Sequence, residues 1–215
     1  MVNSVLIVTG GSVDTEFLRD YMKHFNYDYV VGVDKGIEAL EKLDIKPSLV
    51  IGDFDSANDG VRAKYESNPD AIILNPMKDY TDTHAALEKV MELKPYSITL
   101  VGATGSRVDH MLGNINILLK PLQAGINTCI VDKNNRIRLI DKRCVIRKDR
   151  QYGKYVSLIP YTDIVKGITL TGFLYNLEAA SMIKGETLGI SNEIREEEGR
   201  ISIEEGCLLV LETKD

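Results

Sequence analysis

Leu49–Ser56 reads Leu-Val-Ile-Gly-Asp-Phe-Asp-Ser, an apolar run that ends at a glycine followed by two carboxylates. Uninterrupted apolar runs of this kind are typical of strands buried on both faces of a parallel sheet. Similar runs recur at Val5–Thr9, Tyr29–Val33, Ala71–Leu74, Ser97–Val101 and Thr128–Val131. Helical patterns separate these runs, which predicts βαβ units and a mostly parallel sheet with flanking helices, a Rossmann-like α/β arrangement.

The expected helices lie between these strands, at Asp14–Phe25, Gly36–Leu43, Val61–Glu66, Thr83–Leu93 and Asp109–Leu122. From about residue 135 the segments shorten and alternate, with expected strands at Arg136–Ile140, Tyr155–Ile159, Ile168–Thr171, Arg200–Ile203 and Leu208–Glu212. Short, regularly spaced strands indicate an all-β sandwich. We therefore predict two domains, an α/β domain over residues 1–134 and a β-sandwich domain over residues 135–215, with a solvated loop from Arg195 to Arg200.

Composition restricts the function classes. The net charge of -6 argues against nucleic-acid binding, which requires clustered basic residues. The three widely spaced cysteines, Cys129, Cys144 and Cys207, are expected to be reduced thiols. The N-terminus lacks the features of a signal peptide, and no apolar run approaches the roughly 20 residues that span a membrane. These features predict a cytoplasmic protein without a membrane segment.

Carboxylates follow successive predicted strands or open the next helix. They are Asp34, Asp53, Asp55, Asp79, Asp82 and Asp109. The carboxyl ends of parallel strands line one crevice, so these side chains are expected to gather there. Oxygen ligands suit a hard cation such as Mg2+, which in turn suits a polyphosphate substrate. Each cluster taken alone is also consistent with a turn or a helix cap, for example by Thr81 or Asp82.

The loop Gly102-Ala103-Thr104-Gly105-Ser106-Arg107 follows a predicted strand and opens a helix. Small residues let backbone amides approach an anion, and Arg107 can add bidentate contacts to phosphate. A simple tight turn would also explain the glycines. His110 and Asn114 lie one helical turn apart on the same face; His110 is either a general base or a packed helix residue.

Taken together, the motifs resemble those of the thiamine pyrophosphokinase family. In the first domain the similar segments are Gly52–Ser56, Lys78–Asp82 and Gly102–Asn114, and in the second domain they are Leu170–Leu177 and Gly189–Glu193. The resemblance spans most of the chain, in the same order. It implies a homodimer of subunits that each carry an α/β nucleotide domain and a β-sandwich domain. It also implies transfer of a pyrophosphoryl group from ATP to the hydroxyl of thiamine, giving thiamine diphosphate and AMP.

The resemblance further implies roles for particular residues. Those expected to bind Mg2+ are Asp53, Asp55 and Asp82; those expected to take part in catalysis are Asp55, Asp82, Arg107 and Asp109. The expected ATP-binding residues are Asp34, Lys78, Thr81, Thr104 and Asn114. The thiamine pocket is expected to include Tyr175, Ser191 and Asn192, at the dimer interface.

The expected mechanism is in-line attack of the thiamine hydroxyl on the β-phosphorus of ATP, with Asp55 or Asp109 as the proton acceptor. Tyr175 either stacks on the thiamine rings or belongs to the core of the sandwich. Two other functions fit the same first-domain motifs. One is pyrophosphoryl transfer to another alcohol, such as a hydroxymethylpterin, and the other is a non-catalytic nucleotide sensor.

Overall fold

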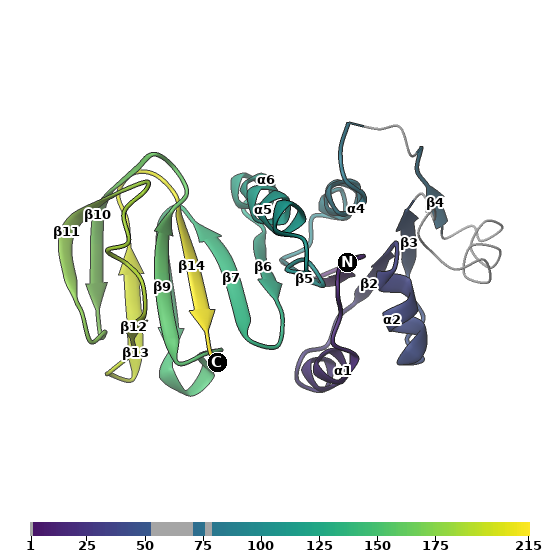
Figure 1. Ribbon diagram of the computed structural model, residues 1–215, viewed down its shortest axis with the longest axis horizontal. Helices are drawn as coiled ribbons and strands as arrows, with labels where there is room; N and C mark the ends of the chain where they lie inside the picture. Colours follow the sequence, from purple (N-terminus) through teal and green to yellow (C-terminus); the bar gives the residue numbers. More distant parts are fainter. Residues whose placement is uncertain (1, 53–70, 76–78) are drawn as a thin grey trace. The chain divides into compact units, whose positions relative to one another are not determined.

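The computed structural model describes residues 2–52, 71–75 and 79–215. The chain divides into two compact units, Met1–Lys133 and Asn134–Asp215, drawn in Figure 1. The helix predicted at Val61–Glu66 lies outside the described residues.

The first unit contains a parallel sheet. Its strands are β1 (Ser4–Val8), β2 (Tyr29–Val33), β3 (Leu49–Gly52), β4 (Ala71–Ile73), β5 (Ser97–Val101) and β6 (Asn127–Val131). Their order is β6-β5-β1-β2-β3-β4, and each neighbouring pair is parallel. The chain thus moves outward from β1 to β4 and then returns to the other side of β1 with β5. A reversal of this kind opens a crevice at the carboxyl ends of the two strands beside it, here β1 and β5.

The helices cover both faces of this sheet. They are α1 (Thr15–His24), α2 (Gly36–Lys42), α4 (Asp82–Met91), α5 (Val108–Asn116) and α6 (Leu119–Gln123). Figure 1 shows α1 and α2 on one face and α4, α5 and α6 on the other. Helix α1 begins after Asp14, whose carboxylate accepts from the amides of Glu16 and Phe17 at 3.0 Å each. Leu18 of the same helix is fully buried in a cluster with residues of β1 and α2.

One predicted helix is wrong in extent. The segment Asp109–Leu122 forms two helices, α5 and α6, instead of one. Pro121 explains the break, because a proline in the middle of a helix loses a backbone hydrogen bond and clashes with the preceding turn. Placed in the first turn of α6, Pro121 needs no amide partner.

The second unit is built from two antiparallel sheets. One has the order β12-β9-β14-β7 and the other β11-β10-β13-β8. The strands are β7 (Asn135–Ile140), β8 (Arg143–Arg147), β9 (Tyr155–Pro160), β10 (Ile164–Thr171), β11 (Leu177–Ile183), β12 (Asn192–Glu193), β13 (Glu198–Ser202) and β14 (Leu208–Thr213), with a 3-10 turn at Lys148–Arg150. Leu158 and Val210 from the first sheet and Ile146 and Leu170 from the second belong to one hydrophobic cluster.

All five strands predicted for this unit are present, with shifted ends, whereas β8, β11 and β12 were not predicted. The predicted loop Arg195–Arg200 is partly wrong, because β13 begins at Glu198 and pairs with β8. In β8 polar and apolar residues alternate, and only Cys144 and Ile146 are buried. An alternation this short is difficult to recognise in a sequence that is rich in turn residues.

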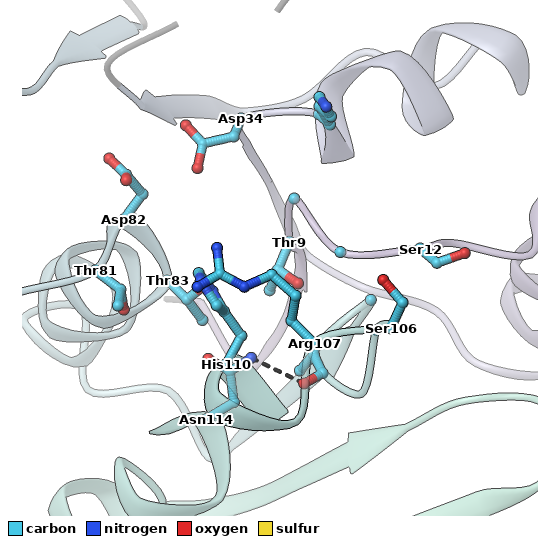
Figure 2. Close-up of a pocket in the computed structure, with 16 residues that line it drawn as sticks. Thr9, Ser12, Asp34, Thr81, Asp82, Thr83, Ser106, Arg107, His110 and Asn114 are labelled. Atoms are coloured by element: carbon cyan, nitrogen blue, oxygen red, sulfur yellow. Dashed lines mark hydrogen bonds between the residues drawn. The ribbon is translucent and has the colours of Figure 1, made fainter. Parts of the chain in front are cut away.

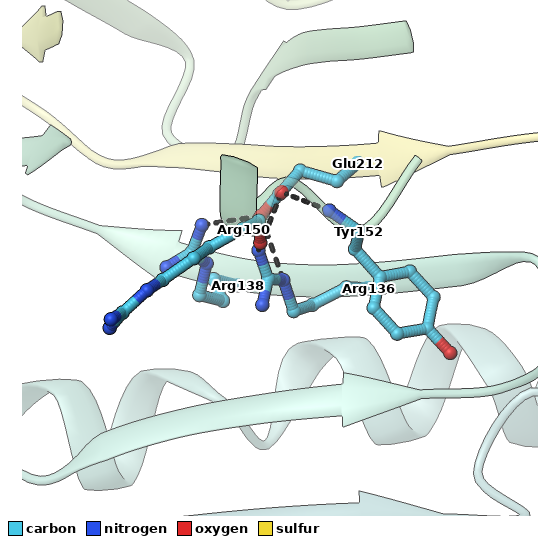
Figure 3. Close-up of polar contacts among 5 residues, drawn as sticks. All are labelled: Arg136, Arg138, Arg150, Tyr152 and Glu212. Atoms are coloured by element: carbon cyan, nitrogen blue, oxygen red, sulfur yellow. Dashed lines mark hydrogen bonds and ion pairs between the residues drawn. The ribbon is translucent and has the colours of Figure 1, made fainter. Parts of the chain in front are cut away.

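A fully buried carboxylate, that of Glu212 in β14, lies inside the second unit (Figure 3). It accepts from Arg136 Nε at 2.8 Å, from Arg136 Nη2 at 2.6 Å and from Arg138 Nη2 at 2.5 Å. The amide of Tyr152 donates to it at 2.9 Å. Four donors therefore offset the cost of removing this charge from water.

None of the helices in the described residues is both long enough and apolar enough to cross a membrane. Cys129, Cys144 and Cys207 are all free thiols.

Candidate active site

A cavity of about 500 Å³ opens at the carboxyl ends of β1, β2 and β5 (Figure 2). Its walls come from the loops that leave these strands and from the first turns of α4 and α5. They comprise Thr9–Ser12, Asp34, Lys35, Thr81–Thr83, Gly102, Ala103, Gly105–Arg107, His110 and Asn114. The crevice expected where the strand order reverses is therefore present, and several of its lining side chains are polar or charged.

The acidic side of the cavity is formed by Asp34 and Asp82, whose carboxylates face it in Figure 2. Asp34 follows β2 with a left-handed backbone, φ 47°, and its amide donates to Ile51 O at 3.1 Å. A Cβ at Gly52 would lie 2.3 Å from Asp34 Oδ1, so glycine at the end of β3 gives this carboxylate room. Asp82 opens α4, where the positive end of the helix favours a carboxylate.

The predicted helix cap between Lys78 and Thr83 is confirmed at Thr81. Its hydroxyl accepts from the amide of His84 at 3.2 Å, and Thr81 also lines the cavity. Capping by Thr81 fixes the first turn of α4 and with it the position of Asp82. Thr81 therefore serves as the helix cap, and Asp82, held in place by that cap, supplies the carboxylate of this segment.

Two glycine-containing loops meet on the opposite side. A Cβ at Gly11 would lie 2.0 Å from the carbonyl oxygen of Gly102, so the loop after β1 and the loop after β5 can touch only because residue 11 is glycine. Asn114, buried in α5, donates from Nδ2 to Ala103 O at 2.8 Å and holds the second loop from behind. The side-chain amide of Asn114 is thus occupied by the protein's own backbone.

Arg107 carries positive charge into the cavity, and Figure 2 shows its guanidinium extended across it. The same side chain forms an exposed ion pair with Asp109, from Nε to Oδ1 at 3.2 Å and from Nη2 to Oδ2 at 2.6 Å. Hydrogen bonding to Arg107 is the largest cause that lowers the pKa of Asp109 to about 2. The pKa of Arg107 is correspondingly raised by its bond to Asp109.

The structure brings together five of the residues predicted for catalysis or ATP binding, namely Asp34, Thr81, Asp82, Arg107 and Asn114. Thr104 and Asp109 belong to the same loop and helix but do not line the cavity. Asp53, Asp55 and Lys78 lie outside the described residues. The roles predicted for all these residues stay predictions.

Several lining residues were not assigned a role from the sequence. They are Thr9, Gly10, Gly11, Ser12, Lys35 and Thr83; Ser106, from the predicted anion-binding loop, and His110, predicted to be either a general base or a packed helix residue, also line the cavity. The available signal was their position: Thr9–Ser12 follow the central strand, and Lys35 follows Asp34 at the end of the next strand.

The three residues predicted for thiamine all lie in the second unit, in two segments that are hydrogen-bonded to each other. Asn192 is buried; its Oδ1 accepts from Tyr175 N at 3.0 Å, and its Nδ2 donates to Tyr175 O at 2.7 Å. Ser191 has a left-handed backbone, φ 58°, and its amide donates to Ser157 Oγ at 3.0 Å. Tyr175 is 65% exposed, so it does not belong to the hydrophobic core of the second unit.

The donor chemistry of the cavity fits a hard cation in part. Asp34 and Asp82 offer only oxygen ligands, as Mg2+ prefers. Within residues 2–52, 71–75 and 79–215, however, no group of three or more His, Cys, Asp or Glu side chains is placed to hold a metal. A complete ligand set would need further oxygens, from the substrate or from Asp53 and Asp55, which the sequence predicts as ligands.

The parallel sheet, with a polar cavity where its strand order reverses, defines an α/β protein with a ligand site at the strand ends. Residues 20–130 match the catalytic domain of thiamin pyrophosphokinase, and residues 143–208 match the vitamin B1 binding domain of the same enzyme. The chain belongs to the thiamin pyrophosphokinase family.

Individual relatives agree with this family. A thiamine pyrophosphokinase of Bacillus subtilis is 36% identical over 187 residues, which are 86% of this chain and 87% of that protein. A crystal structure of thiamine pyrophosphokinase from Bacillus subtilis superposes with a TM-score of 0.88 at 33% identity, covering 99% of this chain and 100% of that one. A thiamin pyrophosphokinase structure from Geobacillus thermodenitrificans gives a TM-score of 0.85 at 35% identity, with 99% and 98% covered.

Proposed function

We propose that this chain is a thiamine diphosphokinase, which transfers a pyrophosphoryl group from ATP to the hydroxyl of thiamine and yields thiamine diphosphate and AMP. The observation that carries the proposal is the cavity that combines Asp34, Asp82 and Arg107 at the strand ends of a chain from this family. Opposite charges on facing walls suit a polyphosphate accompanied by a cation. Similarity to thiamine pyrophosphokinases over most of the chain supports the substrate pair.

In this proposal the first unit is a Rossmann-like catalytic domain, residues 1–134, and the second is a β-sandwich domain, residues 135–215, that binds thiamine. The parallel sheet with helices on both faces supports the first assignment. The two antiparallel sheets that share one hydrophobic cluster support the second. The match of residues 143–208 to a vitamin B1 binding domain supports the role of the second unit.

ATP is proposed to bind with its phosphates in the cavity. Arg107 reaches into the space between the two glycine-containing loops and the acidic side, where it can pair with phosphate oxygens. Thr81 and Asn114 act chiefly by holding backbone in place, the first at α4 and the second at Ala103. Lys78 and Thr104 remain predicted ATP contacts.

Mg2+ is the proposed cofactor, held by Asp53, Asp55 and Asp82. When bound, it neutralises charge on the phosphates and makes the β-phosphorus more electrophilic. The carboxylate of Asp82 lies at the start of a capped helix, a rigid position from which to offer an oxygen. Asp34 faces the same space and can bond the metal's water ligands or the nucleotide.

The proposed reaction is a single in-line displacement. The hydroxyl oxygen of thiamine forms a bond to the β-phosphorus, and the bond from that phosphorus to the oxygen bridging the α-phosphate breaks, so that AMP leaves with the bridging oxygen. The hydroxyl proton passes to a carboxylate. The two predicted acceptors are Asp55 and Asp109. In the free protein the bonds from Arg107 lower the pKa of Asp109 to about 2, so Asp109 is a poor proton acceptor unless Arg107 pairs with phosphate instead.

The proposed thiamine site lies around Tyr175, whose exposed ring can stack on the rings of thiamine and attract its cationic thiazolium. Asn192 fixes the backbone of Tyr175 through two hydrogen bonds, and Ser191 adjoins it. A homodimer with this site at its interface and a cytoplasmic location complete the proposal. Leu174, which precedes Tyr175, is also exposed, as expected of a residue that a partner would cover.

The decisive experiment measures products by chromatography after incubation of the protein with ATP and Mg2+, with and without thiamine. AMP and thiamine diphosphate should appear together, and only when both substrates and the metal are present. Asp82→Asn should remove most of this turnover without loss of folding. Asp20→Asn is the matched control, because Asp20 lies in an exposed ion pair with Lys23 on α1 and should not matter.

Three outcomes would contradict the proposal. Formation of ADP would identify an ordinary kinase. AMP formed only with a hydroxymethylpterin would identify a different acceptor alcohol. Binding of ATP without AMP formation for any acceptor in a panel would identify a nucleotide sensor.

A further inference from the structure

Thr9, the residue that follows β1, carries a buried hydroxyl that the fold does not use. The residue is 1% exposed, and its amide donates to Val101 O at 2.8 Å, which ties it to β5. Its Oγ1 is buried and has no hydrogen-bond partner among the residues that the structure describes. Buried polar groups are nearly always satisfied, and an exception calls for an explanation.

The location of Thr9 suggests that explanation. Thr9 lies at the carboxyl end of β1, beside β5, where the strand order of the sheet reverses, and it is part of the wall of the cavity (Figure 2). The loop that continues from it, Gly10–Ser12, contacts the loop after β5 through Gly11. A hydroxyl at this position can therefore be completed by a ligand in the cavity.

The chemistry of the neighbouring groups restricts the ligand. The amides of Gly10, Gly11 and Ser12 donate to no backbone acceptor within the described part of the chain, and an amide can only donate. A hydroxyl can donate to the same partner as well. A group that satisfies all of them must offer acceptor atoms, as the oxygens of a phosphate do and the cationic thiazolium ring of thiamine does not. Lys35, also at the cavity wall, adds positive charge.

We infer that Thr9 Oγ1 and the amides of Gly10–Ser12 form a subsite that binds a phosphate oxygen of the nucleotide. The inference rests on the proposed function, since it takes ATP to be the ligand of the cavity. It assigns a substrate contact to the loop after β1, in addition to Arg107 and the loop after β5. Thr9 is a binding residue in this assignment and takes no part in proton transfer.

The alternative is that Thr9 merely fills space, with its hydroxyl a tolerated defect. Both accounts predict that Thr9→Val, which replaces the hydroxyl by a methyl group of similar size, leaves the ligand-free protein as stable as before or raises its Tm. They differ in nucleotide binding, because only a ligand contact makes the hydroxyl matter when ATP is present.

The test compares Thr9→Val with Thr9→Ser, which retains the hydroxyl. Thr99→Val is the matched control: Thr99 is a buried threonine of β5, outside the cavity, whose hydroxyl lies 3.8 Å from Cys129 Sγ. Titration calorimetry with ATP and Mg2+, with AMP, and with adenosine is performed without thiamine, and Tm is measured without nucleotide.

Thr9→Val should bind ATP about tenfold more weakly, as expected for loss of one hydrogen bond to a charged group. The affinity of Thr9→Val for adenosine should not change, and the Tm of Thr9→Val should not fall. Thr9→Ser should bind ATP nearly as the unmodified protein does. Thr99→Val should lower Tm and leave ATP affinity unchanged.

Unchanged ATP affinity in Thr9→Val would overturn the inference. So would an equal loss for adenosine and ATP, because the hydroxyl would then face the nucleoside. Failure of the subsite and failure of the proposed function remain distinguishable. If Thr9→Val weakens ATP binding but the unmodified protein forms no AMP, the subsite is supported and the proposed reaction is wrong. If the unmodified protein forms AMP but Thr9→Val binds ATP normally, the proposed reaction is supported and the subsite is wrong. If the unmodified protein binds no ATP, both fall.

Discussion

The buried hydroxyl of Thr9 in the first unit differs in its hydrogen bonding from the buried side chains of Glu212 and Asn192 in the second. In the first unit the buried hydroxyl of Thr9, at the cavity wall, has no partner among the described residues. In the second unit the buried carboxylate of Glu212 is bonded by several groups of the protein itself (Figure 3). The buried side chain of Asn192 is likewise bonded by the backbone of Tyr175. A buried polar group without a hydrogen-bond partner lowers stability, and we expect it to be retained where a ligand supplies the missing partner. Buried groups whose hydrogen bonds are all made within the protein instead hold the local structure in one conformation.

This difference separates two kinds of functional contribution. Around the cavity, substitutions should act mainly on nucleotide binding and turnover, with small effects on stability. In the second unit, substitutions of buried polar residues should act first on stability, and on thiamine binding only through the backbone that they hold. Measurements that report stability and activity separately therefore test this expected difference between the two units.

The largest effect on stability is expected for Glu212→Gln. The change removes the charge that compensates Arg136 and Arg138, whose side chains are 19% and 27% exposed, and leaves two guanidinium groups facing a neutral amide. Because loss of one partner of a buried ion pair costs about 3–5 kcal/mol, and these arginines retain some solvent, the free energy of unfolding should fall by about 3 kcal/mol. Urea denaturation measures it.

The control for this variant is Glu205→Gln, which breaks the exposed Lys166–Glu205 pair in the same unit. An exposed pair contributes about 0–1 kcal/mol, so this variant should unfold nearly as the unmodified protein does. Equal, small effects of both substitutions would mean that the cluster around Glu212 is not needed for the fold of the second unit.

An intermediate effect is expected for Asn192→Ala. The side chain bonds both backbone groups of Tyr175, and its loss leaves partly buried donors and an acceptor unsatisfied, at about 1–3 kcal/mol. If Tyr175 contacts thiamine, the KM for thiamine should rise several-fold while the KM for ATP stays constant. Steady-state kinetics with each substrate varied in turn measures both.

Asn176→Ala serves as the comparison, because Asn176 lies in the same turn but its side chain accepts from one backbone amide among the described residues, Phe173 N at 3.1 Å. It should have the smaller effect on both stability and the KM for thiamine. A rise in the KM for ATP in Asn192→Ala would contradict the division of labour between the two units.

Structural features that depend on residues close together in the sequence could be predicted, whereas features that depend on distant contacts could not. Adjacent strand ends of a parallel sheet meet by geometry alone, so the convergence of Asp34, Asp82 and Arg107 could be predicted from their positions after strands and before helices. The cap at Thr81 was predictable for the same reason, since it involves residues three apart. Asp53 and Asp55, central to the predicted metal site, lie outside the described residues.

Other features depend on contacts that no local pattern encodes. The hydrogen bonds between Asn192 and Tyr175 join residues 17 apart, through a two-residue strand too short to give a periodic signal. Thr9 carries no residue-type signal either: a threonine before two glycines is ordinary turn sequence, and only its burial without a partner distinguishes it. The break before α6 could have been predicted from Pro121, which the expected helix Asp109–Leu122 includes.

The smallest effect on stability is expected at the exposed ion pair of Arg107 and Asp109. This pair also bears on nucleotide binding, because Arg107 lines the cavity. Since the pKa of Asp109 is lowered to about 2 in the folded protein, the pair stabilises the fold above about pH 4, and this contribution is lost as pH falls toward 2. Asp109→Asn should therefore differ slightly from the unmodified protein at neutral pH and converge with it at about pH 2. Unfolding measured across this pH range tests the sign.

The same carboxyl group can report whether Arg107 moves to the substrate. NMR titration of Asp109 should give a pKa near 2 in the free protein and one closer to the ordinary value of about 3.9 in Arg107→Gln. If ATP takes over the guanidinium, its addition to the unmodified protein should raise the pKa of Asp109 in the same direction. A pKa that stays low with ATP bound would mean that Arg107 keeps Asp109 as its partner, and phosphate recognition would then depend on the two glycine-containing loops. An ordinary pKa in the free protein would contradict the ion pair itself.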